Sequence, residues 1–71
     1  MKYTLYTEDA EKLVSGNWTY EFNISTTPAQ QSFDDAIIKP SHQLEMHCSL
    51  DSARGIWKKL IGAGYKVRDN S

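Results

Sequence analysis

The segment 49–65 constrains the fold most, because it has an amphipathic pattern with a helix signal at each end. Its hydrophobic residues recur at spacings of three and four, which places them on one stripe of an α-helix. The residues of this stripe are Ala53, Ile56, Trp57, Leu60 and Ile61. The basic residues Arg54, Lys58 and Lys59 fall on the opposite side. The pattern predicts one main amphipathic helix over about residues 50–63.

Both ends of this helix are marked by residues that satisfy unpaired backbone groups. Ser49 is a good N-cap because its hydroxyl can accept a hydrogen bond from a first-turn N–H. Asp51 then lies in the first turn, where the positive end of the helix dipole stabilises its carboxylate. Gly64 suits the left-handed position after the last turn. We therefore expect a Schellman ending in which Tyr65 packs back on Leu60.

Alternating hydrophobic and polar residues predict strands elsewhere in the chain. The clearest is 17–25, which we expect to form the middle of the sheet with one buried face. The side chains expected on that face are Trp18, Tyr20, Phe22 and Ile24. Residues 2–7 predict a first strand and residues 65–68 a short edge strand. Residues 42–48 predict another strand, which points Leu44, Met46 and Cys48 inward.

Two segments do not give a clear secondary structure from their pattern. Residues 8–15 favour a short helix stopped by Gly16, although a turn followed by a short strand is the alternative. Residues 26–41 show neither helical nor strand periodicity and contain Pro28 and Pro40. We interpret 26–41 as a long connecting loop, a kind of segment that often carries function.

These elements together predict an α+β fold. An apolar helix stripe and an apolar strand face each need a partner, so we expect the helix to pack on one face of the sheet. The expected sheet is mostly antiparallel, with three to four strands. A chain of 71 residues has the size of a single domain, 1–71, which we expect to end in a polar tail at 69–71.

Charge is distributed unevenly, although the net charge is only −1. Residues 1–35 have two basic and six acidic side chains, whereas residues 36–71 have six basic and three acidic ones. The overall balance argues against a dedicated nucleic-acid domain, which is usually strongly basic. No hydrophobic run has the length of a membrane span and no signal peptide is recognisable, so we expect a cytoplasmic protein without membrane contact.

The chain offers few residues for catalysis or metal binding. His42, His47 and Cys48 lack the second ligand pair of a usual zinc site, and strand alternation separates His47 from Cys48. A nucleophilic Cys48 would need a base within hydrogen-bond reach, and no such motif is visible. We therefore predict no metal, no cofactor and no enzymatic activity, with a reactive Cys48 as a minor alternative.

The helix with its ends reads Ser49-x-Asp51-x-Ala53-Arg54-x-x-Trp57-x-x-Leu60-x-x-x-Gly64-Tyr65. This string resembles the C-terminal segment S-x-E-E-A-R-x-x-W-x-x-L-x-x-x-G-W of short uncharacterised proteins from cyanobacteria and their phages. The resemblance covers about a quarter of the chain. It implies a small non-enzymatic protein that acts by binding a photosynthetic or metabolic host complex, and it transfers no catalytic residue.

We therefore expect a protein–protein interaction module, a regulator or inhibitor that occupies a partner's surface or assembles with itself as a homo-oligomer. Large aromatic side chains left outside the core would serve as binding hot spots. The expected partner-binding residues are Arg54, Lys58 and Lys59 on the helix and Phe33, Asp34 and Asp35 in the long loop. The alternative is a nucleic-acid-binding protein that uses the basic helix face.

Overall fold

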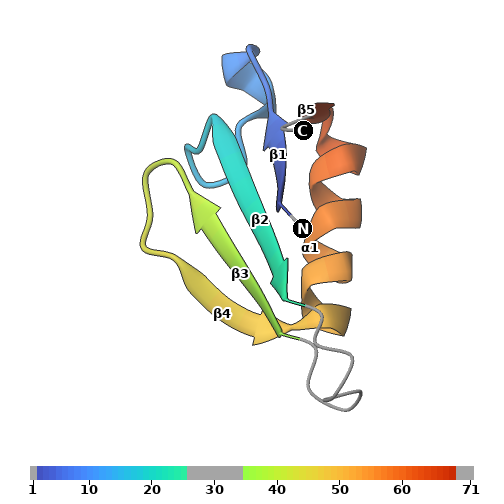
Figure 1. Cartoon of the computed structure of the whole chain (residues 1–71). Helices are drawn as coiled ribbons and strands as arrows, with labels where there is room; N and C mark the ends of the chain where they lie inside the picture. Colours follow the sequence, from blue (N-terminus) through green and yellow to red (C-terminus); the bar gives the residue numbers. More distant parts are fainter. Residues whose placement is uncertain (1, 26–34, 69–71) are drawn as a thin grey trace.

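The computed structural model describes residues 2–25 and 35–68, which form one antiparallel sheet and one main helix (Figure 1). The elements are β1 (Lys2–Tyr6), the 3-10 turn η1 (Ala10–Lys12), β2 (Thr19–Ser25), β3 (Asp35–Pro40), β4 (Met46–Ser49), α1 (Leu50–Ala63) and β5 (Lys66–Arg68). This is the α+β fold expected from the sequence, with one strand more than the largest number predicted. The main helix has the predicted bounds.

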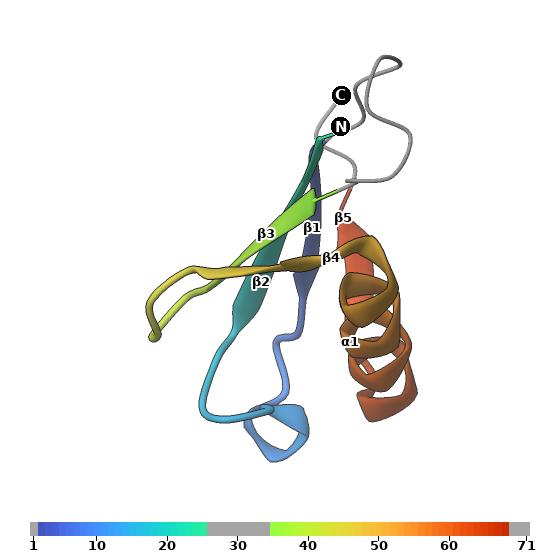
Figure 2. The same ribbon diagram turned by 90° about the horizontal axis from the view of Figure 1, so that it is seen from below.

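The strands lie in the order β4-β3-β2-β1-β5, and every neighbouring pair is antiparallel. The longest strand, β2, lies at the centre, as its alternation predicted. Helix α1 starts directly after the edge strand β4 and leads to the other edge strand, β5. It packs on one face of the sheet only (Figure 2), so two layers enclose a single core.

The core consists of the inward residues of the three central strands, the inner stripe of α1 and Tyr65, which follows the helix. Its buried members are Leu5, Tyr20, Phe22, Ala36, Ile38, Ala53, Leu60 and Tyr65. Trp57 extends this core, since its ring lies edge-to-face on Tyr3 and Phe22 at centroid distances of 5.8 and 5.1 Å. Such aromatic pairs add about 0.5–1.5 kcal/mol each beyond the area that they bury.

The end of α1 follows the Schellman pattern that the sequence indicated. Gly64 has a φ of 105°, and its N–H donates to the Ile61 carbonyl at 3.1 Å. The N–H of Tyr65 donates to the Leu60 carbonyl at 3.0 Å, and both side chains lie in the core. This ending turns the chain from the helix into β5.

A buried polar network joins the end of α1 to the segment between β1 and β2. The Tyr65 hydroxyl donates to the Asn17 carbonyl and accepts from the Val14 N–H at 2.9 Å. The Tyr20 hydroxyl donates to the Val14 carbonyl at 2.6 Å and accepts from the Asn17 amide at 3.3 Å. The Asn17 side-chain carbonyl accepts from the His42 N–H at 2.6 Å. Asn17 is completely buried, and all of its polar groups have partners.

The prediction of a connecting loop over 26–41 was wrong at its C-terminal end, because Asp35–Pro40 forms β3. Ala36, Ile38 and Pro40 are buried and face α1, as a strand pattern requires. The alternation is hard to see in the sequence because Ile37, a hydrophobic residue, lies on the opposite face, and because the inward Ala36 is small. Residues 26–34 of the predicted loop lie outside the described residues, as does the tail 69–71.

Three residues expected to point into the core are exposed instead. Trp18 lies one residue before β2, and its side chain is 38% exposed. Leu44 is 89% exposed because it belongs to the connection between β3 and β4, and the predicted strand 42–48 starts only at Met46. Met46 faces the core side opposite Ile38, but β4 is an edge strand, so Met46 stays 39% exposed.

The helical stripe and the segment 8–15 also differ in part from the prediction. Ile61, expected in the inner stripe, is 42% exposed, because it lies on the flank of α1 rather than over the sheet. The segment 8–15 contains only the single 3-10 turn η1, followed by a bridge between Val14 and Asn17. The Val14 N–H donates to the Tyr65 hydroxyl and the Val14 carbonyl accepts from the Tyr20 hydroxyl, so neither backbone group of Val14 takes part in a longer helix.

Replacing Gly64 by Ala should destabilise the fold by about 1–2 kcal/mol, because an L-residue is strained at this left-handed φ. A Cβ there would also lie 2.6 Å from the Lys12 side chain. Gly62→Ala is the matched control inside α1, where a Cβ meets no heavy atom within 4 Å, and it should stabilise by about 0.5–1 kcal/mol. Urea unfolding measures both changes, and equal stability of Gly64→Ala and the wild type would contradict the Schellman ending.

Tyr20, a member of the buried polar network, should make the free energy of unfolding depend on pH in the alkaline range. Burial raises the pKa of Tyr20 above its ordinary value of 10.0, an effect that the Asn17 hydrogen bond partly offsets. The folded state therefore holds this proton more tightly than the unfolded state, so the stabilisation is complete below pH 10 and is lost above it. Tyr20→Phe should flatten the fall in unfolding free energy above pH 10, measured by urea titrations. An unchanged slope would contradict this assignment.

Candidate functional site

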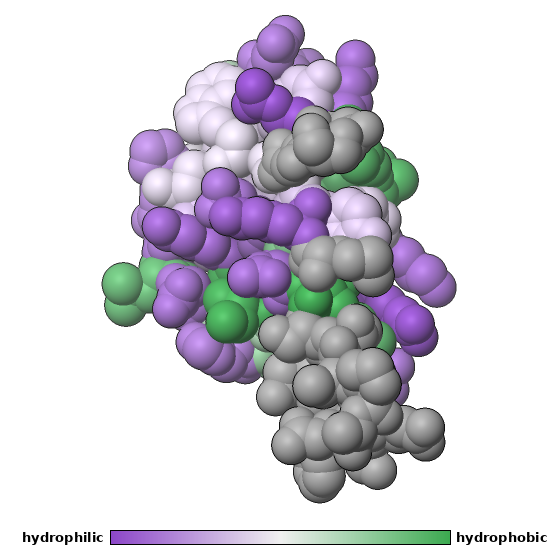
Figure 3. Space-filling model, viewed as in Figure 1, coloured by the Kyte–Doolittle hydropathy of each residue, from purple (hydrophilic) through white to green (hydrophobic). Residues whose placement is uncertain are grey.

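A hydrophobic pocket lies between the start of α1 and the adjacent ends of β1 and β2. Its volume is 220 Å³, and it is lined by Tyr3, Phe22, Ile24, Leu50, Ala53, Arg54 and Trp57. The space-filling view shows small hydrophobic patches near mid-height of the molecule among mostly hydrophilic side chains (Figure 3). The pocket is large enough to accept one bulky hydrophobic side chain.

The small side chain of Ala53 creates this pocket. Ala53 faces the sheet and is buried, but it fills little of the space between helix and strands. Trp57, one turn later, lines one end of the pocket, where its ring packs edge-to-face against Tyr3 and Phe22. Ile24 and Leu50 line the pocket and are only half-buried. A partner that covered this pocket would therefore remove hydrophobic surface from water.

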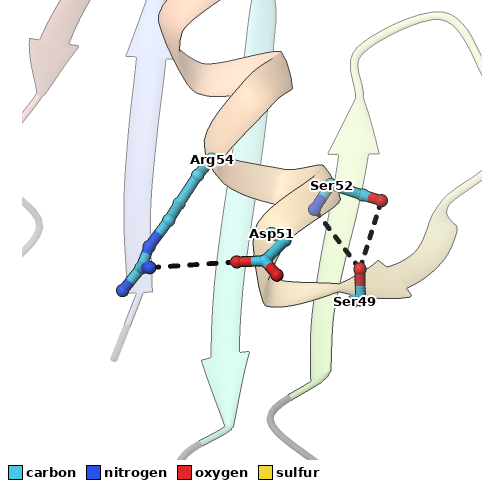
Figure 4. Close-up of polar contacts among 4 residues, drawn as sticks. All are labelled: Ser49, Asp51, Ser52 and Arg54. Atoms are coloured by element: carbon cyan, nitrogen blue, oxygen red, sulfur yellow. Dashed lines mark hydrogen bonds and ion pairs between the residues drawn. The ribbon is translucent and has the colours of Figure 1, made fainter.

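The first turn of α1 is stabilised by its N-cap, Ser49, and it leads to Arg54 at the edge of the pocket (Figure 4). The Ser49 hydroxyl accepts from the Ser52 N–H at 3.3 Å and donates to the Ser52 hydroxyl at 3.1 Å. Arg54 extends from the helix beside the pocket, and its guanidinium lies 3.9 Å from the Asp51 carboxylate. Both side chains are exposed, so this ion pair contributes little to stability and leaves Arg54 available to a ligand.

The structure separates the three basic helix residues that the sequence grouped together. Arg54 lines the pocket, and Lys58 follows it by four residues, which places it one turn further on the same flank. Lys59 is exposed as well, but it lies about 100° further around the helix. Phe33 and Asp34 lie outside the described residues. Asp35 starts β3, and only its backbone is described.

Of the seven residues that line the pocket, only Arg54 had been predicted as a site residue. Leu50 lies between the cap and the helix stripe, and its position in the first helical turn was the available signal. Tyr3 and Ile24 were recognised as strand residues, but nothing in an alternating pattern tells which inward side chain the helix covers incompletely. The pocket arises from packing between distant segments, and for this reason the sequence did not reveal it.

The described residues do not assemble a recognisable catalytic or metal centre. Within 2–25 and 35–68, no three His, Cys, Asp or Glu side chains are grouped so that they could hold a metal ion. Cys48 is a free, half-buried thiol on the core side of β4, whereas His47 faces the other side and lies 3.6 Å from Glu45. No helix in this part of the chain has the length and hydrophobicity to cross a membrane.

Comparison of the chain with protein-family models, curated proteins and solved structures gives no significant match. The pocket geometry therefore carries the functional argument.

The N-cap Ser49 should stabilise the first turn of α1, which forms one side of the pocket. Ser49→Ala leaves a first-turn N–H without its partner and should lower the unfolding free energy by about 1 kcal/mol. Ser49→Asp is the control, because aspartate also caps helices and should retain most of the stability. Thermal and urea unfolding measure this difference. If the two variants lost equal stability, the capping role of Ser49 would be refuted.

Proposed function

We propose that this protein is a small non-enzymatic module that binds another protein. It does so by accepting a hydrophobic side chain in the hydrophobic pocket between α1, β1 and β2, here called the Trp57 pocket. The observation that carries this proposal is the pocket of 220 Å³, which is apolar apart from the Arg54 side chain and the Tyr3 hydroxyl. Protein interfaces depend on a few bulky side chains that enter such desolvated pockets. The described residues that line the pocket include no acid–base or nucleophilic pair that would favour a reaction over binding.

The charges beside the pocket define the partner further. Arg54 at the rim and Lys58 one turn later place two cations on the same flank. A partner segment with Asp or Glu close to its hydrophobic anchor would complement them, and this would favour fast and selective association. The partner is therefore a peptide segment that combines one bulky hydrophobic residue with acidic neighbours.

A regulatory role is consistent with these features and with the resemblance of segment 49–65 to short cyanobacterial and phage proteins. In such a role, the module acts as a regulator or inhibitor by occupying a surface of a host protein complex in the cytoplasm. The helix that carries the resemblance also supplies Leu50, Ala53, Arg54 and Trp57 to the pocket. Self-assembly through exposed hydrophobic residues such as Ile61 is the alternative kind of protein contact.

Selection of peptides from a displayed random library tests this function directly. The bait is the full chain with Trp18→Phe, which leaves Trp57 as the only tryptophan, so that its fluorescence reports binding. We expect enriched peptides to share a bulky hydrophobic residue flanked by Asp or Glu. Arg54→Glu with Lys58→Glu should weaken the selected peptides by about tenfold or more.

Lys59→Glu is the matched control, since it also reverses an exposed charge on α1 but lies away from the pocket flank. It should leave peptide affinity unchanged. An equal loss in Lys59→Glu would show that the whole basic helix face, and not the pocket, is the site. A library that yields no peptide sensitive to Arg54 and Lys58 would refute the proposed function.

A further inference from the structure

The sheet face opposite α1 is not covered by any described element (Figure 2), and it has a composition of its own. In antiparallel pairs, residues opposite each other point to the same face, so the strand register identifies its members. Thr4 pairs with Arg68 on one side and Glu21 on the other, and Glu21 pairs in turn with Lys39. These four residues form one row across β5, β1, β2 and β3.

Two further rows add cations and an aromatic ring to this open face. Tyr6 pairs with Lys66 and with Thr19. Lys2 pairs with Asn23, which pairs in turn with Ile37, and Ile37 pairs with His47 on β4, whose ring lies 3.6 Å from the Glu45 carboxylate. Among the described side chains of the three rows, the charged groups are Lys2, Lys39, Lys66 and Arg68 against the single carboxylate Glu21. This local excess of positive charge contrasts with the net charge of −1 for the whole chain.

The four cations of this face are available to a ligand. Lys2, Lys39, Lys66 and Arg68 are all exposed. The ion pairs found among the described residues, Glu45 with His47 and Asp51 with Arg54, involve none of them. Arg68 on β5 and Lys39 on β3 lie three strand spacings apart, about 14 Å, so an extended anion can contact both side chains at once.

Tyr6 borders two surface hollows next to β5, and each of them is also lined by one of these four cations. One has a volume of 460 Å³ and is lined by Tyr6, Glu8, Val67 and Arg68. The other, of 150 Å³, lies beside the end of α1 and is lined by two carboxylates, Glu8 and Asp9, and by Tyr6, Thr7, Lys12, Gly64 and Lys66. A phosphate would be repelled by the Glu8 carboxylate, whereas the amino group of a nucleobase can donate to it. The hollows thus favour a base, with the phosphates on the surrounding cations.

We infer that the open sheet face binds single-stranded nucleic acid, with phosphates on Lys2, Lys39, Lys66 and Arg68 and a base against Tyr6. This combination of a positive surface with an aromatic platform is how proteins bind single strands without a sequence code. A membrane surface fits less well, because Ile37 is the one aliphatic side chain in the three rows and it is half-buried. The site is distinct from the Trp57 pocket on the other side of the sheet.

Fluorescence anisotropy with a labelled DNA oligonucleotide of mixed sequence, about 12 nucleotides long, tests this inference within the usual site size. We expect binding at low salt that weakens with added salt, with a log–log slope of about −3 for four phosphate contacts. Lys39→Glu and Arg68→Glu should each weaken binding by about tenfold and make the slope shallower by about 0.7. These two sites lie on opposite sides of the face.

The matched charge control is Lys59→Glu on the other side of the molecule, which should bind the oligonucleotide as the wild type does. An equal loss in Lys59→Glu would overturn the site and move it to the helix. Absence of binding at low salt would overturn the inference altogether, and so would tighter binding to phosphatidylserine vesicles than to the oligonucleotide. Circular dichroism of each variant confirms that it is folded.

The aromatic contribution is tested at Tyr6. Tyr6→Leu removes the stacking ring and should weaken single-strand binding by about tenfold, whereas Tyr6→Phe retains the ring and should bind as the wild type does. A duplex of the same sequence should bind less tightly than the single strand and should not respond to Tyr6→Leu. Equal responses of single strand and duplex would refute the base contact and with it the single-strand assignment.

Discussion

The buried hydrogen bonds of Asn17 hold together the parts of this fold that the sheet ladder does not connect. Its side chain binds the backbone at His42, and its main-chain carbonyl accepts from Tyr65 at the end of α1. The connection between β1 and β2, the turn after β3 and the helix end therefore meet at one residue. An unsatisfied polar group at such a buried site is costly, so these segments are ordered together.

This arrangement leaves the two faces of the molecule with different chemistry. On the helix side, α1 crosses the sheet from β4 to β5 and covers the core completely near Leu60 but incompletely near Ala53. The incomplete cover gives an apolar pocket with Arg54 at its rim. On the other side, the strand register gathers cations from β1, β3 and β5 around Tyr6. One short domain thereby presents a hydrophobic anchor site and a polar, positive surface back to back.

The accuracy of the sequence predictions follows the strength of the local signals. Helix α1 and its ends were predicted correctly, because capping and periodicity act within a few residues. Strand β3 was missed because Ile37 masks its alternation, and Trp18 was placed in the core because the exact start of β2 depends on the fold around Asn17. The role of Arg54 as a partner-binding residue stays a prediction, to which the structure adds a pocket next to it.

The sequence by itself determined the local elements of this protein: where α1 begins and ends, which faces of β1 and β2 are apolar, and that the fold is α+β. Only the tertiary structure decided which of these apolar residues are covered. Burial depends on the partner that packs against a side chain, and this partner is distant in the chain, as Ala53 and Phe22 show in the pocket. The rows of the open face are likewise a product of strand register, because hydrogen bonds between separate segments set which side chains become neighbours.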